Sequence, residues 1–146
     1  MSKRTNSRYA AVKALYASEI NEKIDIHKSS AELTLDIISY YHDKVEETPV
    51  ELDEEFLADV VRGVLEARDD LDGKINKNLV EGWKLERLGP VIRSILRAAI
   101  LELMIFTDTP FKVIINEYVN ITRSFYDEKE VGFVNGVLDK ISHEVR

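Results

Sequence analysis

Apolar residues recur along this chain at intervals of three and four positions, the spacing that places them on one face of an α-helix. No run of β-branched residues alternates with polar ones for long enough to indicate a strand. Pro49, Gly82 and the pair Gly89-Pro90 interrupt the pattern, and the connections between its segments are short. The pattern therefore predicts an all-α fold, a compact bundle of about seven helices. Their expected ranges are 7–22, 30–46, 51–68, 72–82, 90–106, 110–126 and 130–144.

The segment 90–106 is apolar around its whole circumference, which is typical of a central helix covered on all sides. Two charged residues interrupt it, Arg97 and Glu102. Because an unpaired buried charge is costly, each of them needs a partner or a route to the surface. They lie five positions apart and so do not face each other. We expect Arg97 to pair with a neighbouring helix, for example one ending at Glu117; a binding role for Arg97 is the alternative.

The segment 110–126 is amphipathic, with one face for the core and one for solvent or a partner. Thr109 and Pro110 predict its start, because a threonine hydroxyl caps a helix and proline is well accommodated at the first helical position. The expected core stripe consists of Phe111, Ile114, Tyr118, Ile121 and Phe125.

The last predicted helix contains the string FVNGVLDKI (133–141). Gly136 is expected to allow a close approach between helices. Phe133 lies at the rim of the apolar stripe, directly after a polar turn expected at 126–132. A rim aromatic can pack, stack on a base or anchor a protein partner, and the residues alone leave these readings open. The expected buried stripe is Val134, Val137, Leu138, Ile141 and Val145.

The first predicted helix has an apolar stripe and, beside it, basic residues. Arg4 and Arg8 lie one turn apart, and Lys3 and Lys13 are near them; no acidic residue occurs before Glu19. A helix N-terminus with basic side chains suits a phosphate backbone. The stripe expected to face the core is Tyr9, Val12, Tyr16 and Ile20.

Charge is unevenly distributed in this chain, whose net charge is −7. The N-terminus is basic, whereas acidic residues crowd the segment 43–59. We expect two different surfaces, one basic and one acidic. Ordinary solvated helix faces are the alternative interpretation.

The composition is that of one globular domain, expected to span 1–146. The chain has 146 residues, 45% of them apolar, and no cysteine, which excludes disulfides and fits a reducing cytosol. The longest apolar run, 98–106, is far shorter than a membrane span, and no signal peptide is recognised. We expect a cytoplasmic protein without membrane contact.

Sequence features of an enzyme are scarce. His27, His42 and His143 lack metal-ligand spacing, and no glycine-rich phosphate loop or serine elbow is present. Adjacent acids such as Asp69-Asp70 point away from each other on a helix. We therefore expect no catalytic residue, no metal and no cofactor.

Four segments match one family's pattern in the right order. They are RYAAVKALY (8–16), LGPVIRSILRAAILEL (88–103), PFKVIINEYVNITRSF (110–125) and FVNGVLDKI (133–141). Together they resemble the NusB family of bacterial transcription antitermination factors, while residues 21–60 match it only in helical character. The resemblance implies a NusB-like helical domain that binds boxA RNA together with NusE, a ribosomal small-subunit protein. The pair would act in the RNA polymerase antitermination complex, especially on ribosomal RNA operons.

The resemblance also implies two sets of contact residues. Thr5 and Asn6 stand where the family's arginine-rich segment would have further arginines, so the basic patch is modest. For the partner NusE, the expected residues are Glu86, Lys129 in the turn before Phe133, and Phe133 itself. The expected RNA-binding residues are Lys3, Arg4, Arg8, Lys13, Tyr16, Phe133 and Asn135.

Two other functions remain open at this stage. Certain ribosomal RNA cytosine methyltransferases carry a NusB-like RNA-binding domain before a Rossmann-type catalytic domain; this chain ends at Arg146 without a glycine-rich cofactor loop. A helical interaction adaptor without any RNA role is the other alternative, and the acidic segment would be its natural evidence.

Overall fold

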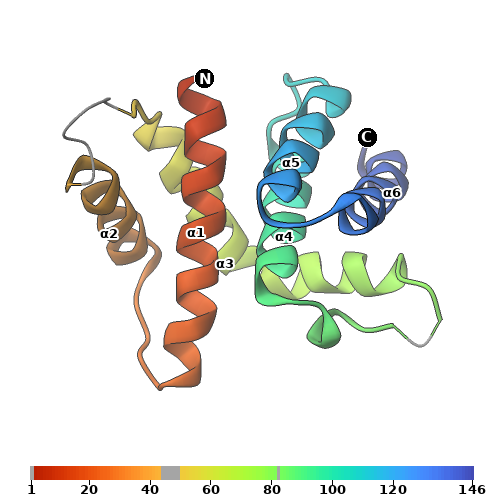
Figure 1. Cartoon of the computed structure of the whole chain (residues 1–146), viewed down its shortest axis with the longest axis horizontal. Coiled ribbons are helices and arrows are strands. Elements are labelled where there is room, and N and C mark those ends of the chain that lie inside the picture. The colour runs from red at the N-terminus through yellow and green to blue at the C-terminus, as the bar shows by residue number, and fades with distance from the viewer. Residues whose placement is uncertain (1, 44–49, 82) are drawn as a thin grey trace. The chain divides into compact units, whose positions relative to one another are not determined.

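A computed structural model describes residues 2–43, 50–81 and 83–146. Within these residues every regular element is a helix, which confirms the predicted all-α class (Figure 1). None of the described helices is both long and apolar enough to cross a membrane. The elements are α1 (Lys3–Lys23), α2 (Ser30–Asp43), α3 (Glu54–Lys77), the 3-10 turn η1 (Leu85–Arg87), α4 (Pro90–Ile105), α5 (Phe111–Phe125) and α6 (Glu128–Val145).

The helix α3 replaces two predicted helices. The expected break between 68 and 72 does not exist, because one buried stripe runs through it at helical spacing. The prediction that the helix extends to 82 is wrong, because α3 ends at Lys77 and residues 78–81 are not helical. Gly82 itself, the break at Pro49 and the predicted helical residues 44–46 lie outside the described residues. The stripe consists of Leu57, Val61, Val64, Leu71 and Ile75, each at most 1% exposed.

The chain forms two compact units, residues 1–66 and 67–146, and α3 contributes to both. In the first unit α1 contacts α2. In the second, α4, α5 and α6 contact one another. The prediction that the helix around 90–106 is central is confirmed for this unit, since every residue from Ile92 to Leu103 is buried. Only near its end does the prediction fail, where Ile105 is exposed.

Arg97 is matched by a carboxylate inside the second unit. Its Nε donates to Asp72 Oδ1 at 2.7 Å and its Nη2 to Asp72 Oδ2 at 2.9 Å. The expected ion pair to a neighbouring helix is therefore present, and the partner lies on α3. Two parallel bonds of this kind fix both the position and the orientation of a guanidinium group.

Two further arginines bind main-chain oxygens in the second unit. Arg93 on α4 donates to the carbonyls of Leu85, Glu86 and Leu88, which holds η1 against the start of α4. At the other end, Arg146 donates to the carbonyls of Leu103, Phe106 and Thr109 at 2.7 to 3.0 Å. A cation at a helix C-terminus satisfies carbonyls that have no partner within the helix.

The C-terminal helices differ from the expectation at four residues, Pro110, Phe111, Phe125 and Val145. Pro110 is the residue before α5 and its carbonyl accepts from Val113 and Ile114, so the helix begins at Phe111 and no side chain caps it. Phe125, the last residue of α5, is exposed and not part of the core. The rest of the expected α5 stripe is buried except Phe111, which is half-buried. In the stripe expected on α6, only Val145 is half-buried rather than buried.

Gly136 was expected to permit a close helix approach, and this is wrong. A Cβ placed on it would meet nothing within 4 Å, because Gly136 lies on the exposed side of α6. The turn before α6 is also shorter than expected, since α6 begins at Glu128. Lys129 therefore lies in the first helical turn.

The first testable prediction concerns the pair Arg97–Asp72. Asp72→Ala should lower the free energy of unfolding by about 3 kcal/mol, because it leaves a nearly buried guanidinium without its carboxylate. The value is the low end of the range for buried pairs, since the Asp72 side chain is 23% exposed. Urea unfolding followed by circular dichroism measures the change. The double variant Asp72→Leu/Arg97→Met should recover most of the loss; an equally unstable double variant would contradict this account.

Candidate nucleic-acid interface

The basic end of α1 belongs to the first unit. The hydroxyl of Ser2 accepts from the amide of Thr5 at 3.0 Å and so caps the helix, which begins at Lys3. Lys3 and Arg4 are exposed in this first turn, and no acidic residue shares the turn with them. Two cations at a helix N-terminus provide a favourable place for a phosphate group.

Two residues of the acidic segment, Glu51 and Asp53, lie against this basic end. Lys3 Nζ is 3.9 Å from a carboxylate oxygen of Glu51, and Arg4 Nε is 3.6 Å from one of Asp53. Asn6 donates to the carbonyl of Glu51 at 3.0 Å, which holds the segment in place. The expectation of separate basic and acidic surfaces is wrong here, because folding brings together charges from distant parts of the chain. The basic end is thus partly neutralised from within the protein.

Arg8 is not on the surface. Its residue is 3% exposed, and its guanidinium carbon lies 5.3 Å from the centre of the Phe56 ring. The guanidinium of Arg4 lies 4.7 Å from the same ring. A cation over an aromatic face is stabilised by the ring's quadrupole. Arg8 therefore contributes to the packing of the first unit, and the expectation that it offers an exposed phosphate contact is wrong.

Lys13 and Tyr16 lie further along α1. Lys13 is half-buried and Tyr16 is 38% exposed, so Tyr16 is not in the core stripe where the spacing placed it. Ile20, also expected in that stripe, is exposed, while Val12 is buried and Tyr9 is half-buried. The side of α1 that is buried carries smaller residues, which permit closer helix packing. It includes Ala10, Ala11, Ala14, Leu15 and Ser18, and Ser7, Arg8 and Val12 are buried as well.

The remaining predicted residues belong to the second unit. Phe133 is half-buried and Asn135 is exposed, both on α6. The rim position expected for Phe133 agrees with this partial burial. Lys129 and Glu86 are exposed, and the backbone beside Glu86 is fixed by Arg93. The structure thus divides the predicted residues between the units: four accessible ones on α1, and four on η1 and α6.

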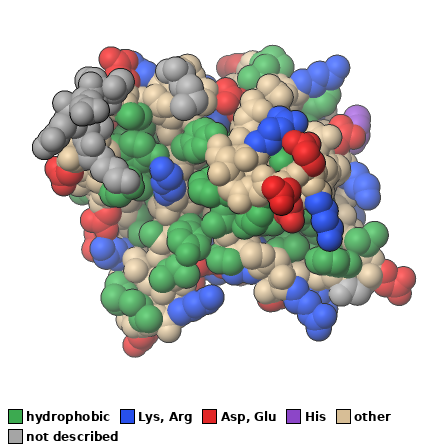
Figure 2. Space-filling model, in the orientation of Figure 1, with side chains coloured by type: hydrophobic (Ala, Val, Ile, Leu, Met, Phe, Trp, Pro, Cys, Tyr) green, Lys and Arg blue, Asp and Glu red, His purple; other side chains and the backbone are tan. Residues whose placement is uncertain are grey.

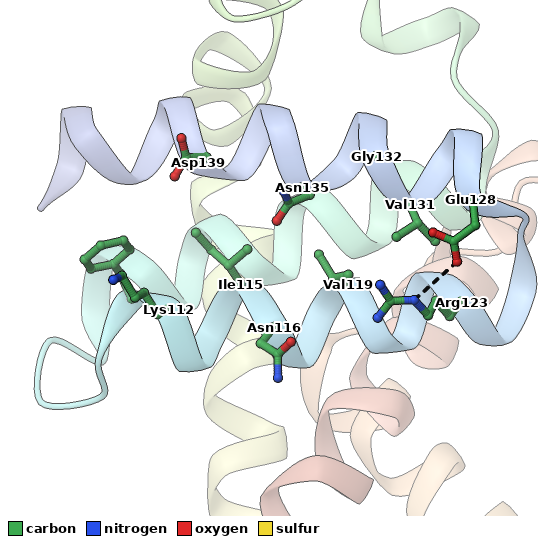
Figure 3. Close-up of a pocket in the computed structure, with 11 residues that line it drawn as sticks. Lys112, Ile115, Asn116, Val119, Arg123, Glu128, Val131, Gly132, Asn135 and Asp139 are labelled. Atoms are coloured by element: carbon green, nitrogen blue, oxygen red, sulfur yellow. Dashed lines mark ion pairs between the residues drawn. The ribbon is translucent and has the colours of Figure 1, made fainter.

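A groove between α5 and α6 was not foreseen from the sequence. It has a volume of about 480 Å³ (Figure 3). Asn135 lines it, and at one end Arg123 Nε lies 3.5 Å from a carboxylate oxygen of Glu128. The available signal was the spacing of Ile115, Val119 and Arg123, a second stripe on α5 beside the core stripe. Its apolar lining comes mainly from Phe111, Ile115, Val119 and Val131.

Charge is mixed on the face of the molecule that Figure 2 shows. Lys and Arg side chains are interspersed with Asp and Glu rather than gathered in one large patch. Among the described residues, no group of three His, Cys, Asp or Glu side chains is placed to hold a metal ion. The accessible basic residues of α1 remain a candidate contact for an anionic polymer.

Comparison with known proteins identifies the family. The NusB family model matches residues 5–143. The transcription antitermination protein NusB of Caulobacter vibrioides is 41% identical over 145 residues, with 98% of this chain and 94% of that protein covered.

Solved structures agree with this match. NusB of T. maritima has a TM-score of 0.78 at 29% identity and covers 98% of this chain and 92% of its own. The fold also matches a chain in the crystal structure of antitermination factors NusB and NusE in complex with dsRNA. That TM-score is 0.79 at 24% identity, with 99% of this chain and 98% of the other covered. From its first helix to its last, this chain belongs to the NusB family.

Proposed function

We propose that this protein is a transcription antitermination factor that binds boxA RNA together with NusE. In the RNA polymerase antitermination complex the pair would promote processive transcription of ribosomal RNA operons. The observation that carries the proposal is the match to antitermination proteins over nearly the whole of both chains. The same fold occurs in a complex with NusE and dsRNA, so a chain of this shape can serve both partners.

The charges of the first unit suggest how binding is divided between the two proteins. Lys3 and Arg4 offer phosphate contacts, but each already lies near a carboxylate of the segment 51–53. Phosphate contacts give affinity and not sequence choice. RNA binding by this chain alone is therefore weak, and NusE supplies further contacts. Binding of RNA and of NusE should consequently be cooperative, each raising the affinity for the other by the same factor.

The alternatives have less support. In a methyltransferase, the NusB-like part would be a fraction of the protein, whereas 94% of the Caulobacter protein is covered by its match to this chain. An adaptor without RNA binding would use the acidic segment as a surface, yet Glu51 and Asp53 lie beside basic side chains. We propose no catalytic role. Because a bacterial chromosome is transcribed in the cytoplasm, the protein acts there.

Retention of the protein on immobilised boxA RNA, with and without purified NusE, tests the proposal. We expect weak retention alone and strong retention with NusE. A matched RNA of scrambled sequence is the control. If, in the presence of NusE, retention on boxA RNA does not exceed retention on the scrambled RNA, the proposed function is wrong.

A second prediction tests the phosphate contacts of α1. Lys3→Ala/Arg4→Ala should weaken RNA binding and reduce the log–log salt slope by up to about 1.4, since each single-strand phosphate contact contributes roughly 0.7. A salt titration by fluorescence anisotropy measures the slope. Arg62→Ala is the matched control, because it removes an exposed cation from α3 in the same unit. An unchanged slope in the double variant would exclude these side chains as phosphate ligands.

A variant in the acidic segment should have the opposite effect on RNA affinity. Glu51→Gln removes the carboxylate near Lys3 and keeps the size of the side chain. It should raise RNA affinity, by up to about fivefold, because an exposed ion pair of this kind is worth at most about 1 kcal/mol. A fall in affinity would contradict a competing role for Glu51.

A third prediction tests Glu86. Ribosomal proteins are generally basic, so an exposed acidic side chain at the interface raises the association rate more than the affinity. Glu86→Lys should slow association with NusE in stopped-flow measurements. The control Asp108→Lys makes the same charge change at another exposed position of the second unit. Equal rates for the two variants would place the interface elsewhere.

A fourth prediction tests Phe133. Because the ring is only half-buried, Phe133→Ala should shift thermal unfolding little, but weaken the complex with RNA and NusE by about 1–3 kcal/mol. Calorimetry measures both quantities. Phe125→Ala, which truncates an exposed phenylalanine on α5, is the control. A large loss of stability with normal binding at low temperature would show that the Phe133 ring serves only packing.

A further inference from the structure

A cluster of one lysine and two tyrosines joins α1 to α2 in the first unit. Lys13 Nζ donates to the hydroxyl of Tyr41 at 3.1 Å. The same ammonium lies 5.1 Å from the centre of the Tyr41 ring and 6.0 Å from that of Tyr40. The two rings meet edge to face, with centres 5.6 Å apart and planes at 84°. One cation is thus placed beside two perpendicular aromatic rings.

The two rings differ in their access to solvent. Tyr41 is half-buried and bonded to Lys13, which accounts for its position by packing between the helices. Tyr40 is 40% exposed. Helix packing therefore explains Tyr41 better than Tyr40, whose large ring remains accessible beside a positive charge.

Exposed aromatic rings continue from this cluster along α1. Tyr16 is 38% exposed and lies three residues after Lys13, so the two are neighbours on the helix surface. Lys13 belongs to the same helix as Lys3 and Arg4. The surface of α1 and α2 thus combines cations along one helix with accessible rings beside them, the arrangement that single-stranded nucleic acid recognises through phosphates and base faces.

We propose that Tyr40 is a stacking platform for one unpaired base of the bound RNA, with Lys13 beside it contacting the adjacent phosphate. The RNA-binding surface then extends from α1 onto α2. This inference rests on the proposed function. A flat π-face accepts any base, so Tyr40 adds affinity with little sequence preference.

The chemistry of the cluster favours RNA over a protein partner. Leu35 on α2, at 64% exposed, offers an apolar side chain outside the cluster, of the kind that a protein partner would bury. At Tyr40 the ring and the ammonium lie together, which matches a base followed by its phosphate. Leu35 consequently provides a control on the same helix.

The test uses the full chain with NusE and a single-stranded boxA RNA that carries fluorescent 2-aminopurine at one position, moved along the RNA in turn. Stacking quenches this fluorophore. We expect quenching at one position in the wild-type complex, its loss in Tyr40→Ala and its retention in Tyr40→Phe, which keeps the ring. Affinity should fall roughly five- to 150-fold in Tyr40→Ala, the range for losing one stacked base.

The salt dependence separates stacking from charge. Tyr40→Ala should leave the log–log slope unchanged, whereas Lys13→Ala should lower it by about 0.7. Leu35→Ala should change neither quenching nor affinity. Urea unfolding of Tyr40→Ala and Tyr40→Phe establishes that both are folded under the binding conditions.

Three outcomes would overturn the inference. If the wild type binds boxA RNA and Tyr40→Ala binds it equally well with the same quenching, Tyr40 is not a stacking residue. If Tyr40→Ala instead loses only association with NusE, this surface serves the protein partner. If the wild type with NusE does not bind boxA RNA at all, the proposed function fails and the inference fails with it.

Discussion

Arg97 lies on α4, the helix that both α5 and α6 contact, and the carboxylate of Asp72 binds its guanidinium group at two points. A helix that is buried along twelve consecutive residues can contain a cation only if the surrounding chain supplies oxygen atoms to it. Arg93 meets the same requirement with three carbonyls, and the exposed Arg146 donates to the Leu103 carbonyl near the end of α4. Apolar burial around α4 therefore stabilises the second unit, and the hydrogen bonds of its arginines fix how α3 and η1 lie against α4. Because these bonds are directional, they also fix η1, the turn that carries Glu86.

In the first unit, contacts between cations and other protein groups shape the candidate RNA surface. Arg8 is buried over the Phe56 ring, and Lys3 and Arg4 lie close to Glu51 and Asp53. Protein carboxylates thus occupy positions where phosphates would be favourable. In the proposed complex RNA would compete with these carboxylates, which would lower the intrinsic affinity of this chain. NusE would then supply further contacts, so that a chain of net charge −7 binds RNA as half of a pair.

The candidate contacts are divided between two compact units with different chemistry. The first unit provides cations and exposed tyrosines on α1 and α2, while the second provides Glu86, the rim aromatic Phe133 and an open groove between α5 and α6. Cations and rings suit a nucleic acid, and an acidic turn suits a basic protein. The proposed complex with RNA and NusE would use one surface of each kind.

The sequence by itself determined the helical class, the central position of the helix around 90–106, the need for a partner of Arg97 and the family. The first three follow from the order of apolar and polar residues, because local spacing fixes which residues share a helix face. The family follows from the four segments that resemble its pattern. Sequence spacing does not decide which side of a helix its neighbours cover. On α1 the apolar stripe and the alanine side lie next to each other, and packing buried the smaller residues and left Tyr16 exposed. Only tertiary structure brought together Arg97 and Asp72, which are 25 residues apart, and Asn6 and Glu51, which are 45 apart. The burial of Arg8, the partly neutralised basic end and the cluster of Lys13 with Tyr40 and Tyr41 depend on such distant contacts.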